Sequence, residues 1–595
     1  MFMRLVKQNF RMRLLPLVWV ALLPALSSGV AAQVQEDESK TAAPRTGALT
    51  GRVINENGQP VSHARVYVTT PISLPQPRTT FTDDSGSFEV SGLDASVYNV
   101  GASAPSYITA PREPDSLPPY YRIGDSVTIR LLKGGVITGT VTSPTSEPMV
   151  QSGVRAILIR DSNGKPPTGP RSPITRATDD RGVYRIYGLA SGTYLVSTGG
   201  RWLYGYSSNA YDSDAPTYAP SSTRDGAAEI VVRAGEETTG VDIRYRGEPG
   251  HAVSGVVSGL TAPDSDPNVT LTQIVNGTPQ ATFFSFEPFD SKGFAFYGVA
   301  DGDYDLIAQS YLSQGDTTAS EPLRITVKGA DITGIELVVK GLGSISGHMT
   351  LETSVSPECK NKRQPLLSET LLVLRRSEKN TPRDQLVFLS LFAQSSPDKS
   401  GDFVLRNLGP GQFGLNVRFF AKYWYLRSIA RETTAVQPLR GGLVNRQADV
   451  ARNGISLKFG ERVSGLTVTL AEGAASLRGT IKLALGESVP AKLRLNLVPA
   501  ERESAEDVLR FFTVPVNSEG TFVVNNLPPG RYWAFARVVA DSEPQSDARL
   551  RAPEEAGTRA QIRRAAEAAK TAVEFKPCQN VSNYELPLKV SPLKN

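Results

Sequence analysis

A short pattern of turn residues followed by alternating apolar residues recurs along the chain, and each copy predicts a β-hairpin. The clearest copy, NSEGTFVVNNLPPGRY, runs from Asn517 to Tyr532. An Asn or Asp side chain bonds its own backbone at the start of a turn, and a Gly three residues later takes the positive φ that ends it. The alternation that follows, with Phe522 and Val524, indicates a strand with one buried face. The five copies pair Asp83 with Gly86, Asp179 with Gly182, Asp290 with Gly293, Asp398 with Gly401, and Asn517 with Gly520.

Two further signatures accompany these copies. Before each copy, a Gly lies between two apolar residues, with one spacer on each side; these glycines are Gly51, Gly139, Gly255, Gly347 and Gly479. A Gly inside a strand indicates a bulge or a close approach of another backbone. Most copies are followed by two short strands around a Gly turn, as in ISLKFGERVSGLTVTL at 455–470. Repetition of this kind predicts a tandem array of similar domains.

The order of these motifs resembles the carboxypeptidase regulatory-like domain. The motifs are GxVxG, then PVxxAxVxV at 60–68, then DxxGxFxxxxLPPGxY, and the resemblance covers nearly all of the chain after its leader. It implies a transthyretin-like (prealbumin-like) β-sandwich of seven strands, related to starch-binding-like and collagen-adhesin modules. We therefore expect an all-β protein, a tandem array of five such sandwiches with one helical insertion in the last.

A chain of 595 residues is too long for a single hydrophobic core, which agrees with several domains. The expected divisions are a signal peptide at 1–32, a polar linker at 33–45, and five repeats at 46–133, 134–247, 248–341, 342–472 and 473–595. The last repeat contains PEEAGTRAQIRRAAEAAK at 553–570, where Pro and Glu at the start and Lys at the end favour a helix. We expect this helical insertion at about 551–572.

The leader combines a basic start with an apolar stretch at 14–26 and small residues at 30–32, which is typical of a secretory signal peptide. The alternative is a membrane anchor, but Pro16 and Pro24 interrupt the stretch, and it is shorter than the ~20 residues that span a bilayer. No later segment is long and apolar enough to span one. We therefore expect export to the periplasm, the cell surface or the medium.

The net charge argues against a nucleic-acid partner. The formal charge of +5 falls to +1 without the leader, which holds four basic residues and no acidic ones. Binding to nucleic acid requires a basic face.

The sequence contains no recognisable catalytic motif. The three histidines, His63, His251 and His348, do not have metal-ligand spacing, and no HExxH, CxxC, GxSxG or phosphate-binding loop motif is present. We expect no catalytic residue, no bound metal and no cofactor. The acidic pairs at 83–84 and 179–180 raise a calcium hypothesis, but a repeated Asx turn explains the same residues without a metal.

The two cysteines, Cys359 and Cys578, are candidates for one disulfide because an exported chain meets an oxidising compartment. Such a bond would tie the fifth repeat to the fourth. The alternative is two unpaired thiols in separate domains, and the sequence leaves both open.

An insertion in the second repeat is the candidate binding site. It carries five aromatic residues among Gly, Ser, Asn and Asp: Trp202, Tyr204, Tyr206, Tyr211 and Tyr218. Aromatic rings on polar loops form recognition surfaces, and flat rings stack on sugars. The alternative is that these rings pack against the sandwich or between neighbouring domains.

We expect an exported, non-enzymatic, multi-domain binding protein of the cell envelope. Its preferred partner is a polysaccharide or envelope glycan, because related sandwich modules bind glycans. The alternative is a structural or adhesive scaffold that contacts other envelope proteins through sheet edges, and a third class is a hydrolase with an unrecognised site.

Overall fold

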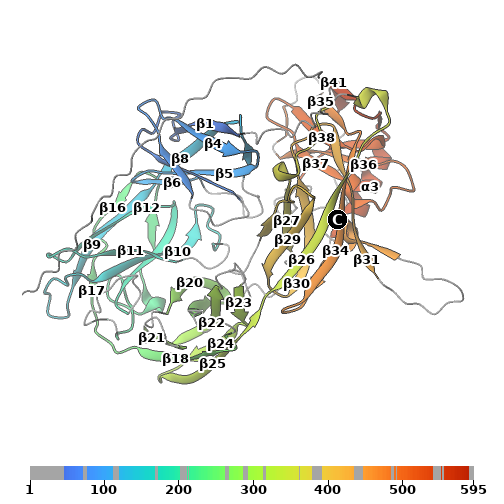
Figure 1. Ribbon diagram of the computed structural model, residues 1–595. Coiled ribbons are helices and arrows are strands. Elements are labelled where there is room, and N and C mark those ends of the chain that lie inside the picture. The colour runs from blue at the N-terminus through green and yellow to red at the C-terminus, as the bar shows by residue number, and fades with distance from the viewer. Residues whose placement is uncertain are drawn as a thin grey trace, which may run out of the picture. The chain divides into compact units, whose positions relative to one another are not determined.

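The computed structural model describes residues 46–70, 77–110, 119–167, 172–200, 211, 213–260, 267–285, 292–311, 317–360, 362–377, 392–433, 446–483, 488–490, 492–539, 551 and 555–588. The signal peptide and linker expected at 1–45 therefore lie outside the described residues. Nearly all of the regular secondary structure in the described part is strand, which confirms the all-β prediction. Figure 1 shows its sheets coloured in chain order from blue to red.

The first repeat holds two four-stranded sheets, ordered β4-β1-β8-β6 and β3-β2-β5-β7. Leu49, Val66, Phe88 and Val100 from both sheets are buried in one core. The strands are β1 (Thr46–Ile54), β2 (Arg65–Thr69), β3 (Arg78–Phe81), β4 (Ser87–Asp94), β5 (Val97–Ser103), β6 (Tyr107–Thr109), β7 (Tyr121–Arg122) and β8 (Ser126–Lys133).

The second repeat also holds two sheets. One is β11-β10-β13-β14, with β15 also paired to β13, and the other is β12-β9-β16, with β17 also paired to β9. The strands are β9 (Gly135–Thr142), β10 (Gly153–Asp161), β11 (Ile174–Ala177), β12 (Val183–Leu189), β13 (Gly192–Thr198), β14 (Thr217–Tyr218), β15 (Ile230–Val232), β16 (Glu237–Thr238) and β17 (Ile243–Arg244), and η1 (Arg224–Gly226) is a 3₁₀ turn.

The third repeat differs, because its strands form one eight-stranded sheet, β20-β19-β22-β23-β25-β18-β21, with β24 paired to β22. The short strand β23 pairs with both β22 and β25, and so joins two groups of strands that stay separate in the first two repeats. The strands are β18 (His251–Ser258), β19 (Pro267–Val275), β20 (Thr278–Phe284), β21 (Gly293–Val299), β22 (Gly302–Tyr311), β23 (Thr317–Ser320), β24 (Leu323–Val327) and β25 (Ile332–Gly341).

The fourth repeat returns to two sheets, β29-β26-β34-β31-β32 and β28-β27-β30-β33. Its core includes the fully buried Trp424. The strands are β26 (Gly343–Glu352), β27 (Leu371–Arg376), β28 (Phe392–Ser395), β29 (Asp402–Leu408), β30 (Gly411–Arg418), β31 (Trp424–Thr433), β32 (Arg446–Asp449), β33 (Ile455–Leu457) and β34 (Arg462–Glu472). Short helical turns are η2 (Pro357–Cys359), η3 (Leu367–Glu369) and α1 (Val450–Asn453).

The fifth repeat holds the sheets β38-β35-β41 and β37-β36-β39-β40. The predicted helical insertion is helix α3, which lies beside β36 of the second sheet (Figure 1). It buries Ile562 and Ala566 against Val498 and Phe535. The elements are β35 (Ala475–Lys482), β36 (Leu493–Pro499), η4 (Val508–Arg510), β37 (Phe512–Pro515), β38 (Thr521–Leu527), β39 (Gly530–Val538), α3 (Ala556–Ala569), β40 (Ala572–Phe575) and β41 (Asn580–Pro587).

One topology recurs in all five segments. The first strand pairs antiparallel with the strand of the hairpin motif and parallel with a closing strand, as β1 does with β4 and β8, and β35 with β38 and β41. The predicted boundaries also fall between strands. We therefore keep the division into five sandwiches as our proposal.

Candidate functional site

The repeated strand glycines lie where the closing strand comes closest to the first strand. A Cβ atom at Gly51, Gly139, Gly255, Gly347 or Gly479 would come within 2.0 to 2.3 Å of a carbonyl oxygen of the closing segment. Real Cβ atoms do not approach an oxygen so closely, so a larger residue would push the strands apart. The predicted close backbone approach explains these glycines, and their role is structural.

The repeated Asp and Asn residues form Asx turns. Oδ1 of Asp398 accepts bonds from the amides of Ser400 and Asp402, at 2.9 and 3.0 Å, and Oδ1 of Asn517 accepts from Glu519 and Thr521. Asp83 and Asp179 make the equivalent bonds, whereas Asp290 lies outside the described residues.

These turns favour the structural explanation over calcium. Hydrogen bonds lower the pKa of Asp83, Asp179 and Asp398, chiefly those from the side chains of Ser85, Arg181 and Ser400 respectively. In the described part of the chain, no group of three His, Cys, Asp or Glu residues is placed to hold a metal ion. The turn amides bond Oδ1 of each of these carboxylates, so the Asx turn by itself accounts for the repeated residues.

In four of the five motif copies, the Tyr that ends the copy closes a corner between strands. The hydroxyl of Tyr98 donates to the carbonyl of Asp94, four residues earlier, at 2.8 Å. Tyr194, Tyr304 and Tyr532 donate in the same way to Ala190, Ala300 and Pro528. Burial raises the pKa of Tyr304 and Tyr532, so both hydroxyls remain protonated donors.

Two of the three histidines contact carboxylates. His348 Nδ1 lies 2.8 Å from Asp402 Oδ1, and His251 Nε2 lies 3.2 Å from Asp301 Oδ1. The hydroxyl of Ser400 donates to Asp398 and Asp402. A serine nucleophile needs a hydrogen bond to the imidazole, and Ser400 bonds carboxylates instead.

His63, the third histidine, adopts a positive φ of 54° in the turn before β2. This place in a turn agrees with a structural residue.

Two of the five aromatic residues predicted to bind a ligand, Tyr211 and Tyr218, lie in the described part of the chain. Trp202, Tyr204 and Tyr206 lie outside the described residues. Tyr211 is half-buried and packs edge-on against Tyr245, with ring centroids 5.3 Å apart. Tyr218 is only 5% exposed and packs in the cluster that forms the core of the third repeat. For Tyr211 and Tyr218, these contacts favour the packing alternative, and the buried Tyr218 ring offers no face to a ligand.

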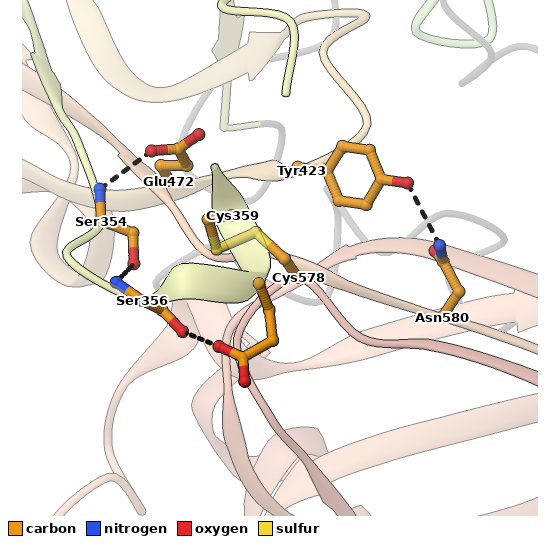
Figure 2. The surroundings of a disulfide bond; sticks show 8 residues. Ser354, Ser356, Cys359, Tyr423, Glu472, Cys578 and Asn580 are labelled. Carbon is orange, nitrogen blue, oxygen red and sulfur yellow. Dashed lines mark hydrogen bonds between the residues drawn. A yellow bond between two sulfur atoms is a disulfide. The ribbon is translucent and has the colours of Figure 1, made fainter. Parts of the chain in front are cut away.

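A disulfide joins the fourth and fifth repeats (Figure 2). The Cα atoms of Cys359 and Cys578 are 5.4 Å apart, within the range of an ordinary disulfide. Cys359 is on η2 and Cys578 lies in the turn before β41; their exposed fractions are 2% and 7%. The bond closes a sequence separation of 219 residues.

Hydrogen bonds surround this bond on both sides of the junction. The carbonyl of Tyr423 accepts from the amides of Gly473 and Ala474, each at 2.9 Å, and the amide of Cys578 donates to the carbonyl of Gly473 at 3.0 Å. The side chain of Asn580 donates to the hydroxyl of Tyr423 at 3.1 Å (Figure 2). The backbone of the connecting segment is therefore fixed from both repeats.

Asn526 is a junction residue that sequence reasoning missed. Its Nδ2 donates to the carbonyls of Ala421 and Trp424 in the fourth repeat, at 2.9 and 2.7 Å. Its φ of 58° is left-handed, and the same motif position is Gly92, Gly188 or Gly298 in the first three repeats.

Asn407 occupies this position in the fourth repeat, with a φ of 60°, and accepts from the amide of Thr317 in the third. Asn is the side chain that best tolerates this conformation, and here it also reaches the preceding repeat. In the sequence, the only indication of this contact is that Asn replaces Gly at this motif position in the fourth and fifth repeats.

The fourth and fifth repeats also share apolar and charged contacts. Val508 and Leu509 of the fifth repeat lie in the same buried cluster as Trp424 of the fourth. An ion pair links Arg452 to Glu506 at 2.9 Å. The candidate functional site is therefore this junction, which connects two repeats by covalent, polar and apolar contacts.

Residues 48–118 match the family model of the carboxypeptidase regulatory-like domain. This match confirms the resemblance for the first repeat. No curated protein matches the chain. In the described part of the chain, no helix is both long and apolar enough to cross a membrane.

Several solved structures show a weak similarity to this chain. The Bacillus anthracis TIE protein is 12% identical, covering 74% of this chain and 69% of its own, with a TM-score of 0.14. The shaft pilin SpaA of Lactobacillus rhamnosus GG is 12% identical, covering 34% and 98%, with a TM-score of 0.16. A minor pilin of Streptococcus agalactiae is 13% identical, covering 34% and 96%, with a TM-score of 0.18. With identities and TM-scores this low, the similarities indicate nothing about the partners of this chain.

Proposed function

We propose that this chain is an exported, non-enzymatic scaffold that connects components of the cell envelope. The observation that supports it best is the junction of the fourth and fifth repeats. A buried disulfide, the two bonds from Asn526 and a shared apolar cluster restrain the same pair of domains. A protein that must hold two attachment points at a fixed separation needs such restraint, whereas a single ligand-binding domain does not.

Envelope proteins are the proposed partners of this scaffold. The strand that follows the Asx turn in each motif copy lies at the edge of its described sheet. These edge strands are β4, β12, β21, β29 and β38. An edge strand is a surface on which another chain adds a strand. Carbohydrate binding, our first expectation, is supported by none of the described contacts of Tyr211 and Tyr218.

Pulling on single molecules tests the scaffold function. With the disulfide formed, force applied to the two ends does not extend the 219-residue span between Cys359 and Cys578. Reduction should then lengthen the fully unfolded chain by about 700–800 Å, at ~3.3–3.6 Å per residue. Equal lengths before and after reduction would contradict a restrained junction. Binding of the mature chain to a glycan array, combined with equal lengths, would favour the carbohydrate alternative.

A further inference from the structure

A cavity of about 460 Å³ lies beside the junction and is separate from the disulfide. Its volume is in the range of about 300–1,000 Å³ that small-molecule sites occupy. Strands β30, β31, β37 and β38 of the fourth and fifth repeats supply half of the lining, and the first repeat supplies one side. Apolar residues that line it include Tyr120, Val417, Phe419, Leu426, Phe512 and Val514.

The polar residues of this cavity are cationic or neutral. Arg418 and Arg551 line it, together with the carboxamides of Asn525 and Asn526, and no Asp or Glu is among the described residues of the lining. Arg551 is positioned by its neighbours: its Cζ lies 5.2 Å from the centre of the Phe512 ring, and its guanidinium donates to the carbonyl of Phe511 at 3.4 Å. The cavity therefore combines an aromatic wall with a guanidinium held beside it.

The position of Asn526 connects this cavity to the junction. Its Nδ2 is engaged by two carbonyls of the fourth repeat, which fixes the carboxamide at the boundary of the cavity. The neighbouring Asn525 is exposed and lines the same cavity. Phe420 also lines the cavity and forms a cation–π contact with Arg122, whose Cζ lies 4.6 Å from the ring centre.

We infer that this cavity binds a small organic anion with an aromatic or long aliphatic body, such as a carboxylate. Guanidinium groups form paired hydrogen bonds with carboxylates, and the apolar wall removes the body of the ligand from water. An organic cation would meet two arginines and, in the described part of the lining, no carboxylate. A sugar would leave many hydroxyls facing apolar walls without partners.

Fluorescence binding to the full mature chain tests this inference with a matched pair of probes. Anilinonaphthalene sulfonate is anionic, and phenylnaphthylamine has the same rings without the charge. The sulfonate should bind saturably, and decanoate should displace it while decanol does not. Arg551→Gln should weaken sulfonate binding about tenfold, as expected for loss of a charged hydrogen bond, and leave the neutral probe unchanged.

Two further variants keep the test decisive. Arg418→Gln is the second cavity variant, because Arg418 is exposed on β30 and its replacement does not disturb a core. Arg478→Gln, an exposed position on β35 outside the cavity lining, is the matched control and should have no effect. Equal loss of both probes in the cavity variants, or unchanged sulfonate affinity in all three, would overturn the inference. Displacement by decanol as well as decanoate would show apolar adsorption only.

Discussion

At the scale of single residues, the repeated strand glycines lie where the fold leaves no room for a side chain. A Cβ at Gly479 would lie 2.2 Å from the carbonyl oxygen of Tyr584 and 2.8 Å from Cζ of Phe522. Gly479→Ala should therefore lower the free energy of unfolding by about 1–3 kcal/mol, the usual cost of overpacking. Urea denaturation followed by circular dichroism measures it.

Gly557→Ala is the control, since a Cβ there meets nothing within 4 Å and Gly557 is helical. It should stabilise the protein by up to about 1 kcal/mol. Equal effects of both substitutions would show that the strand glycines are not constrained by the closing strand.

Asn526 gives the second prediction at this scale. Asn526→Gly keeps the left-handed backbone that the first three repeats reach with Gly, but removes two hydrogen bonds to the fourth repeat. It should cost about 1–3 kcal/mol. Asn526→Ala should cost about 1 kcal/mol more, because Ala is strained at positive φ. If both variants unfold at the same urea concentration as the parent chain, the hydrogen bonds of Asn526 do not stabilise the junction.

The sequence predicted the glycines and Asx turns because their causes are local. A turn that needs positive φ, or an approach that excludes Cβ, restricts the residue type at one position, and repetition makes it visible. The bonds of Asn526 to Ala421 and Trp424 join residues about a hundred positions apart, so no local pattern encodes them. The polar neighbours of Tyr218 group it with the candidate binding residues, although its ring is buried.

At the scale of elements, the Asx turns predict how stability responds to acid. The folded-state pKa values of Asp83, Asp179 and Asp398 lie below the ordinary value of 3.8. A carboxyl with a lowered pKa contributes stability above its unfolded pKa, and that contribution is lost as the pH falls through the folded pKa. The turns should therefore weaken below about pH 4.

The triple variant Asp83→Asn, Asp179→Asn and Asp398→Asn checks this response. Asn forms the same turn without a titrating group, as Asn517 does in the fifth repeat. The urea midpoint of the variant should fall less between pH 6 and pH 3 than that of the parent chain. An identical fall in both proteins would exclude these carboxyls as a source of acid sensitivity.

The hairpins and the helix α3 were predictable at this scale, because alternation and capping are properties of short segments. The single sheet of the third repeat was not. It depends on β23, a strand of four residues that bonds β22 on one side and β25 on the other. A strand so short has too few residues to show a period, and its two pairings connect distant parts of the repeat.

At the scale of the whole molecule, the disulfide is the restraint with the longest reach. Cross-linking two residues removes conformational entropy from the unfolded chain, and the effect grows with the closed loop. For the separation of 219 residues between Cys359 and Cys578, this corresponds to about 5 kcal/mol. The double variant Cys359→Ser and Cys578→Ser should unfold at a lower temperature, with the loss confined to the fourth and fifth repeats.

Thiol labelling of the exported protein decides whether the bond is formed there. Unfolded but unreduced protein should take up no maleimide, and the same protein after reduction should take up two equivalents, because these are the only cysteines of the chain. In the folded state, a reductant should act slowly, since both sulfur-bearing side chains are less than a tenth exposed. Two labelled thiols without reduction would remove the covalent restraint from the junction. The bonds of Asn526 and the cluster around Trp424 would then have to hold the fourth and fifth repeats together on their own.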